Sequence, residues 1–269
     1  MPRQAGGCPV CLTRRVRFLR IAGGRIYWRC RVCQATFLDP SQLPGLDEEL
    51  KRYLLHENDP DDPRYRNFLS KVSTPLLNRL PPRCVGLDFG CGPGPALAKM
   101  LSEAGHDLHL YDPFFAPDPS SLERSYDFIT CTEVAEHLHR PAATFASLDK
   151  LLRPGGWLAV MTSFQTDDAG FGNWYYRQEP SHVVFYREET FHHLAKQFDW
   201  TCEIPAANVA LMQKPKGQSA ARDRKNQVSP NSTLGSRLPR DIDRGGFIAV
   251  LQRIGEGEYL SPRDREHFL

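Results

Sequence analysis

Between residues 83 and 213, apolar runs typical of strands alternate with segments of helical periodicity, and this alternation constrains the fold more than any other feature. The run CVGLDFG precedes PALAKMLSEAG, and YDFITCTE precedes AATFASLDKLL. Strands that alternate with helices usually pair in parallel, with the helices covering both faces of the sheet. We therefore predict a doubly wound, mostly parallel α/β domain over residues 83–213.

The loop LDFGCGPG joins the first predicted strand to its helix. It carries Asp88, followed by glycines at alternate positions, Gly90, Gly92 and Gly94. Such a loop lets the backbone approach a ligand, and the N-terminus of the next helix points at it. Pro95 stands where the dinucleotide fingerprint requires glycine or alanine, and no Lys-Ser/Thr pair completes a P-loop. The spacing therefore indicates a ligand site of another kind.

Four ordered motifs resemble those of the class I S-adenosylmethionine-dependent methyltransferases, in the small-molecule branch that includes the ubiquinone-pathway O-methylases. LDFGCGPG resembles motif I, HDLHLYD the second strand, YDFITCTEVAEHL the fourth strand, and LDKLLRPGGWLAV the turn into the fifth. EPSHVVFYREETFHHLAKQFDW resembles that branch's histidine-containing loop and next helix. The resemblance implies a Rossmann-like sheet of the seven-stranded type. Since PFFAPDPSS is short and rich in proline, we expect an abbreviated third strand and helix.

The resemblance also implies S-adenosyl-L-methionine as cofactor and a set of residues that bind it. In this interpretation the glycines pass close to the cofactor, Asp88 holds the loop or the ammonium group, and Asp112 accepts from the ribose hydroxyls. Asp112 is alternatively a turn acid before Pro113. The expected cofactor-binding residues are Asp88, Gly90, Cys91, Gly92, Gly94, Asp112, Thr132 and Glu133. Cys91 is interpreted as a small spacer between two required glycines.

Two histidines are candidates for the catalytic role. The resemblance places His182, in PSHVVFY, on a loop near the substrate, where an imidazole could act as general base or only position the backbone or substrate. His137 is expected on a helix that begins near Glu133, where it either reaches the pocket or packs. The aromatic run WYY at 174–176 could form a lid over a planar substrate or a locally packed loop.

Two Cys-x2-Cys pairs near the N-terminus predict a structural zinc ribbon. Cys8 and Cys11 precede Cys30 and Cys33, and short alternating runs flank Gly23-Gly24 as in a β-hairpin. A disulfide pair or free thiols are the alternatives. Because no export signal is recognisable, we expect a reducing, cytoplasmic location, in which paired cysteines more often hold metal.

The predicted domains are a zinc ribbon at 1–38, a helical connector and lid at 39–82, the methyltransferase domain at 83–213, and a disordered linker and tail at 214–269. The ribbon carries eight arginines and no acid, although the whole chain has a net charge of only +2. With its aromatic side chains this excess could form an RNA-binding surface; the other interpretation is a solvated ribbon that docks on the catalytic domain and helps frame the substrate. No run of about 20 apolar residues suggests a membrane partner, and the oligomeric state is not predicted.

Together these features predict an S-adenosylmethionine-dependent methyltransferase acting on oxygen or carbon of a small molecule. The first alternative is an RNA base methyltransferase that uses the basic ribbon to hold its substrate. The second is a non-catalytic scaffold that binds the cofactor.

Overall fold

The computed structural model describes residues 6–55 and 58–217. Most of the predicted tail, from residue 218 onward, lies outside these residues. Lys214, the first residue of the predicted tail, contacts the α/β domain: its Nζ donates to the carbonyls of Asp149 and Leu152 at 2.6 and 3.0 Å. Among the described helices, none has both the length and the apolar character needed to cross a lipid bilayer.

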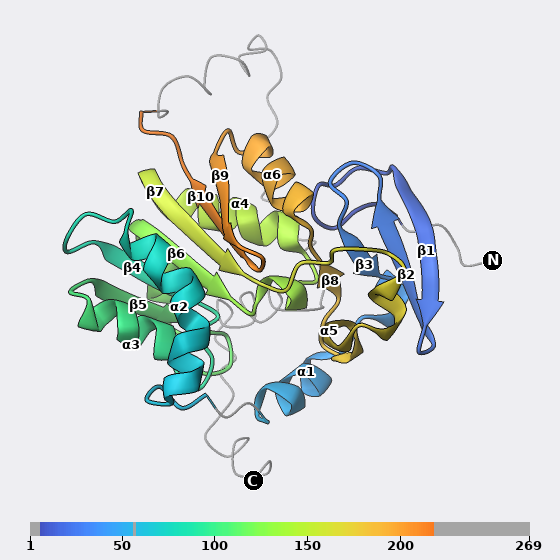
Figure 1. The fold of residues 1–269 in the computed structure, drawn as a ribbon, viewed down its shortest axis with the longest axis horizontal. Helices are drawn as coiled ribbons and strands as arrows, with labels where there is room; N and C mark the ends of the chain where they lie inside the picture. Colours follow the sequence, from blue (N-terminus) through green and yellow to red (C-terminus); the bar gives the residue numbers. More distant parts are fainter. Residues whose placement is uncertain (1–5, 56–57, 218–269) are drawn as a thin grey trace, which may run out of the picture.

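A six-stranded sheet in the order β5-β4-β6-β7-β10-β9 forms the centre of the α/β domain (Figure 1). The pairs β4–β5, β4–β6 and β6–β7 are parallel, and β10 is antiparallel to both of its neighbours. The strands are β4 (Val85–Phe89), β5 (Asp107–Tyr111), β6 (Tyr126–Thr132), β7 (Leu152–Met161), β9 (Thr201–Ala206) and β10 (Val209–Gln213). The predicted mostly parallel sheet is confirmed.

The third strand and its helix are reduced to a turn, in agreement with the proline-rich sequence. After β5 the chain forms only an isolated bridge between Asp112 and Ala116 and the 3-10 turn η2 (Pro119–Leu122). Prolines in this span lack the N–H groups that a ladder or a helix interior requires. This side of the sheet therefore ends at β5 among the described residues.

Helices cover both faces of the sheet, as expected for a doubly wound domain (Figure 1). Helices α2 (Pro63–Leu77) and α3 (Ala96–Glu103) pack on the face that carries Phe128 and Trp157. Helices α4 (Pro141–Leu151) and α6 (Glu188–Gln197) pack on the opposite face. Successive strand residues point to opposite faces, so neighbours such as Trp157 and Leu158 enter different hydrophobic layers. Each fully buried large side chain contributes roughly 1.5–3 kcal/mol.

The N-terminal ribbon contains the predicted hairpin, β1 (Val16–Ala22) and β2 (Arg25–Cys30), and extends it. Strand β3 (Thr36–Leu38) pairs with β2 and also with β8 (Val184–Phe185), which belongs to the α/β domain. The side chains of Tyr27 and Phe185 lie in one hydrophobic cluster, with ring centroids 6.0 Å apart. The ribbon therefore shares a sheet and a core with the α/β domain.

Short elements complete the connections. They are α1 (Leu46–Tyr53), α5 (Tyr175–Gln178) and the 3-10 turns η1 (Pro40–Gln42), η3 (Ala135–His137) and η4 (Gly170–Asn173). The prediction of a helix that begins near Glu133 is wrong, because only the three-residue 3-10 turn η3 forms there. Glu133 is left-handed and Leu138 is extended, so neither flank allows further helical turns.

Candidate functional site

The ten non-metal residues predicted from the sequence all line one cavity of about 490 Å³. This volume is typical of small-molecule sites. The cavity lies beyond the carboxyl ends of β4, β5 and β6, where ligands of open α/β sheets bind. The residues are Asp88, Gly90, Cys91, Gly92, Gly94, Asp112, Thr132, Glu133, His137 and His182.

The glycine loop is shaped by positions that only glycine fits. Gly90 and Gly92 have φ angles of +78° and +64°, in the left-handed region that other residues rarely adopt. A Cβ on Gly90 would lie 2.3 Å from Val134 Cγ2, and one on Gly94 would lie 1.8 Å from the carbonyl oxygen of Asn58. Gly90 and Gly94 are therefore required for the close approach of the loop to Val134 and Asn58, two residues that also line the cavity.

Asp112 connects the glycine loop to the end of β5. Its Oδ2 accepts from Gly92 N at 3.1 Å, while its Oδ1 accepts from the backbone N–H groups of Phe114 and Phe115 at 2.9 and 3.1 Å. Burial raises the pKa of Asp112, and these three hydrogen bonds oppose the rise. The carboxylate supports the loop in addition to facing the cavity, a function that the sequence did not reveal.

Asp88 is 4% exposed and holds the base of the same loop. Thr130 Oγ1, from the neighbouring strand β6, donates to Asp88 Oδ1 at 2.7 Å. Burial raises the pKa of Asp88 to about 6. A carboxylate so desolvated gains from a nearby positive charge, such as the ammonium group of an amino acid.

The end of β6 is strained at Glu133, whose φ of +53° is unusual for a residue with a side chain. Its N–H donates to Met161 O at 2.8 Å, and its Oε2 accepts from Tyr176 OH at 3.3 Å. Burial and the charge of Glu136 raise the pKa of Glu133 well above its ordinary value. Such strain costs of order 1–3 kcal/mol and is concentrated at functional sites.

Glu136, His137 and His182 form a buried cluster on the other side of the cavity. One potential ligand atom from each lies within 4.8 Å of the others, a donor set that could hold a cation. His137 Nδ1 donates to Ser181 O at 3.1 Å and His182 Nδ1 donates to Tyr176 O at 2.7 Å, because a carbonyl can only accept. In the neutral tautomer each Nε2 is then a proton acceptor.

The electrostatic environment keeps His182 neutral. Burial, followed by the charge of His137, lowers the pKa of His182 to about 4. At neutral pH the ring is unprotonated and can accept a proton, but it is a weak base.

Sequence reasoning missed the residues that close the cavity from the connector. Tyr53, on α1, contacts the rings of His137 and Phe114 at centroid distances of 5.3 and 5.5 Å. Glu49 of the same helix pairs with His139 at 3.0 Å between Oε1 and Nε2. Tyr53 lies in the segment expected to be a helical connector and lid, but its helical periodicity gave no sign of which residue would face the cavity.

Tyr176, in the aromatic run at 174–176, does not line the cavity but contacts two residues that do, Glu133 and His182. Its ring is buried, and its hydroxyl lies 3.0 Å from Thr162 Oγ1 as well as near Glu133. Trp174 packs against Phe171 and Phe185, and Tyr175 is 73% exposed. The run is a packed loop, and its member Tyr176 supports two residues of the cavity wall.

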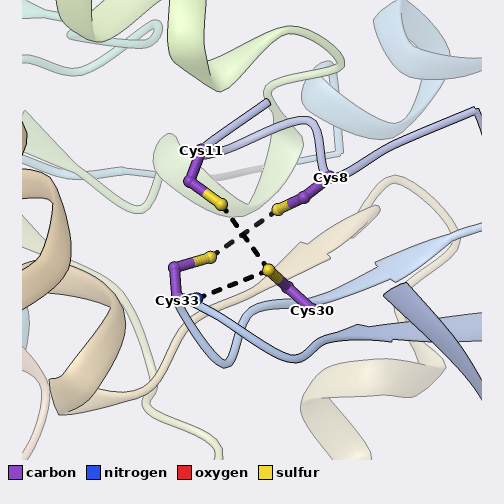
Figure 2. Close-up of side chains that lie close together, drawn as sticks. All are labelled: Cys8, Cys11, Cys30 and Cys33. Carbon is purple, nitrogen blue, oxygen red and sulfur yellow. Dashed lines mark hydrogen bonds between the residues drawn. The ribbon is translucent and has the colours of Figure 1, made fainter. Parts of the chain in front are cut away.

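The four predicted metal ligands converge at the base of the ribbon (Figure 2). The Sγ atoms of Cys8 and Cys33 are 3.6 Å apart, and those of Cys11 and Cys30 are 3.5 Å apart. Four thiolates around a tetrahedral zinc ion, each about 2.3 Å from it, would be separated by roughly 3.8 Å. All eight cysteines are free thiols, so the disulfide alternative is not realised in the structure. The donor set fits a closed, structural zinc site.

Both cysteine pairs lie on turns of matching geometry. The residue four positions after the first cysteine of each pair is left-handed, Leu12 with φ +61° and Gln34 with φ +64°. In the second turn the backbone N–H groups of Val32 and Cys33 donate to Cys30 Sγ at 3.3 and 3.4 Å. These donors stabilise a thiolate, which is the form that binds metal.

The ribbon braces the histidine side of the cavity through β8. Leu38 N donates to Val183 O, and Val183 N in turn donates to Glu136 O, each at 2.8 Å. Tyr186 OH donates to Ala135 O at 2.9 Å. The turn that carries Glu136 is therefore connected by hydrogen bonds to the sheet that the four cysteines hold.

Asp168, in the loop after β7, is a second link between the ribbon and the domain. Its carboxylate pairs with Arg17 at 3.2 Å, with Arg187 at 2.6 Å, and with the buried Arg29. Burial, together with the charge of Arg187, lowers the pKa of Arg29 to about 10. One carboxylate thus pairs with three guanidinium groups.

A family model described as a methyltransferase domain matches residues 58–203. A ubiquinone biosynthesis O-methyltransferase of Burkholderia vietnamiensis (strain G4 / LMG 22486) is 31% identical over 100 residues, covering 28% of this chain and 43% of that protein. The corresponding protein of Cronobacter sakazakii (strain ATCC BAA-894) is 25% identical over 150 residues, covering 56% and 48%. The chain thus spans less than half the length of these relatives.

Among solved structures, the N-methyltransferase NodS from Bradyrhizobium japonicum WM9 is similar at 18% identity and a TM-score of 0.41. The match covers 58% of this chain and 99% of that one.

Proposed function

Because this chain belongs to the methyltransferase-domain family, we propose that it transfers a methyl group from S-adenosyl-L-methionine to oxygen or carbon of a small molecule. The observation that carries the proposal is the single cavity on which all ten predicted residues converge. The relatives named as O-methyltransferases support a small-molecule acceptor.

We assign cofactor binding to the cavity wall formed by the glycine loop and Asp112. The positive sulfonium of the cofactor supplies an activated methyl group when bound. Gly90 and Gly94 let the loop pack closely against Val134 and Asn58, and the cofactor would pass along the backbone of this loop. Asp88 would face its ammonium group, and the Asp112 carboxylate would accept from its ribose hydroxyls.

We assign acceptor binding to the opposite wall, with His182 and His137 as the residues nearest the reaction. The protein's task there is to align the acceptor atom with the methyl group and to remove a proton where the acceptor requires it. His182 Nε2 supplies a proton acceptor, and because the pKa of His182 is low, a proton taken up from the acceptor molecule is readily released. The zinc ion, held by Cys8, Cys11, Cys30 and Cys33, would have a structural function only.

Asp112→Ala tests the cofactor assignment. We expect at least about a tenfold loss of S-adenosylmethionine affinity, roughly 1.4 kcal/mol, because the variant loses both a ligand contact and the support of the loop. Titration calorimetry measures this, with Asp107→Ala as a control on the exposed start of β5. Unchanged affinity in Asp112→Ala would refute the assignment.

The acceptor class is tested by incubating the protein with radiolabelled cofactor and a cell lysate, and then separating small molecules, RNA and protein. Label in the small-molecule fraction is expected. Label in RNA would favour the RNA methyltransferase. Cofactor binding without label in any fraction would favour the non-catalytic scaffold.

One observation supports RNA as a second candidate acceptor. Arg14, Arg15 and Arg31 are exposed, and none has an ion-pair partner in the described part of the chain. Other ribbon arginines contact the α/β domain: Arg17 and Arg29 pair with Asp168, while Arg20 and Arg25 donate to its carbonyls. The basic character is thus divided between docking and free surface, which weakens the case for RNA. Absence of RNA binding at low salt would exclude this candidate.

A further inference from the structure

A second cavity, of about 550 Å³, lies between the ribbon hairpin, helix α1 and the segment that follows α5. Its walls are formed by residues that the cofactor cavity does not use, including Arg25, Glu49, Arg52 and Arg177. The two cavities nevertheless share elements, because α1 also carries Tyr53 and the segment after α5 also carries His182.

The side chain of Arg177 lines this second cavity without a counter-ion. Arg177 is 8% exposed, and no carboxylate of the described residues pairs with it. Its Nη1 makes two long hydrogen bonds, 3.4 Å each, to Ala22 O and Tyr27 OH. Its Nε is buried without an acceptor. A buried and uncompensated guanidinium is costly to fold, so a ligand that pairs with it is the simplest explanation for its presence.

None of the described acids around the cavity pairs with Arg25 or Arg177. Glu49 pairs with His139 and Glu179 pairs with Arg52, while Glu48 accepts from Gly45 N at 3.1 Å. Arg25 adds a second positive charge at the wall, where it donates to Pro180 O at 2.6 Å. The cavity therefore presents two guanidinium groups that no carboxylate of the described residues balances.

We propose that this second cavity binds the carboxylate group of a small molecule, with Arg177 as the principal partner and Arg25 as the second. A guanidinium matches a carboxylate with two parallel hydrogen bonds. Glu48 and Glu49 in the same wall disfavour a doubly charged anion such as phosphate. Leu43, Pro44 and Pro180 provide apolar surface for the rest of the ligand.

Thermal unfolding with sodium benzoate as probe tests the proposal, with sodium chloride at the same ionic strength as reference. A ligand that binds only the folded state raises the unfolding temperature with its concentration. We expect a rise for the unaltered protein, none for Arg177→Met, and a smaller rise for Arg25→Gln. Arg64→Gln is the matched control, because the Arg64 side chain is 93% exposed and lies far along the chain on α2.

A separate measurement distinguishes a ligand-binding arginine from a structural one. Without benzoate, Arg177→Met is expected to unfold at the same temperature as the unaltered protein or higher, since it removes an uncompensated buried charge. A fall of more than about 5 °C would assign Arg177 a structural function and overturn the proposal. The proposal is also overturned if benzoate has no effect, stabilises Arg177→Met equally, or is outperformed by inorganic phosphate. Because no methyl transfer is measured, these results are independent of the proposed activity.

Discussion

The two sides of the cavity are built in different ways. The proposed cofactor side consists of Asp88, the glycines at 90–94 and Asp112, which all lie between positions 88 and 112; Gly92 N donates to Asp112 Oδ2, and Thr130 of the neighbouring strand donates to Asp88. The proposed acceptor side consists of Glu136, His137, Tyr176 and His182, which come from separate segments and are braced by the ribbon. The difference suggests that the cofactor side forms from local geometry, while the acceptor side depends on long-range packing.

Loss of zinc should produce the largest difference in local stability between the two sides of the cavity. Cys33→Ser removes one of the four thiolates, and structural zinc sites contribute about 10 kcal/mol or more to folding in isolated peptides. We expect hydrogen exchange at 183–186 and 135–137 to accelerate by at least about tenfold, while exchange at 88–92 and 111–114 stays nearly unchanged. Mass spectrometry of the peptides measures both. Cys202→Ser, at a partly buried thiol on β9, is the control. Equal acceleration on both sides would show that the whole domain depends on the ribbon.

The Asp168 cluster offers a second way to disturb the connection between the ribbon and the α/β domain. Asp168→Ala leaves Arg29 buried without a partner, which should cost about 3 kcal/mol, at the low end for buried pairs because Asp168 is 38% exposed. Urea unfolding measures the change. Glu123→Ala, an exposed site after η2, is the control.

A rescue variant tests the cause of that loss. Combining Asp168→Leu with Arg29→Met removes the charge together with its partner, and most of the lost stability should return. If the double variant is no more stable than Asp168→Ala, the cluster acts through packing and not through charge.

The difference between local geometry on the cofactor side and long-range packing on the acceptor side also explains which features could be predicted from the sequence. The glycine loop and the two cysteine pairs were recognisable because their chemistry depends on short, fixed spacings, whereas Asp112 was assigned only through the family resemblance. Strand β8 has only two residues and pairs with β3, about 150 positions earlier, so no local pattern could reveal it. The counter-ion of Arg29 was equally unpredictable, because Asp168 is 139 positions away. The helix expected near Glu133 failed for a local reason, since the left-handed backbone of a non-glycine residue is not encoded by helical periodicity.

The two sides should also respond to pH in opposite directions. On the cofactor side, burial raises the pKa of Asp88 from 3.8 to about 6, so the folded state binds this proton more tightly than the unfolded state. The contribution of Asp88 to folding stability is therefore favourable at low pH and is lost as pH rises from about 4 to about 6. Asp88→Asn should become more stable than the unaltered protein across that interval, by up to roughly 3 kcal/mol at neutral pH. Urea unfolding at several pH values, without cofactor, measures the difference. A constant difference across the interval would contradict the raised pKa.

On the acceptor side, burial lowers the pKa of His182 from 6.5 to about 4, so the folded state resists protonation. Stability is therefore lost as pH falls from about 6.5 to about 4. The His182→Gln variant has no imidazole to protonate. As pH falls from about 6.5 to about 4, its stability relative to the unaltered protein should therefore rise by up to roughly 3 kcal/mol. His193→Gln, on α6 outside the cavity, is the matched control. If the difference in unfolding free energy between His182→Gln and the unaltered protein did not change with pH, the His182 ring would be more solvated than the structure indicates.

The smallest effect is expected at Cys91, which lies between the two left-handed glycines of the cofactor side. Its thiol is 8% exposed, and burial together with the charges of Asp88 and Asp112 raises its pKa. A protonated thiol is a poor nucleophile, and its Sγ lies 3.6 Å from Gly92 O without another hydrogen-bond partner in the described residues. Cys91→Ala and Cys91→Ser should therefore bind cofactor and transfer methyl groups within about twofold of the unaltered protein.

Gly90→Ala, one position away, is the informative contrast. Its Cβ would clash with Val134, and its backbone would be strained at positive φ, so cofactor affinity should fall by more than about tenfold. Together the two substitutions ask whether this stretch acts through its backbone or through its thiol. If Cys91→Ala abolished methyl transfer while cofactor binding stayed intact, the thiol would take part in the reaction, and the cofactor side would no longer be explained by backbone geometry alone.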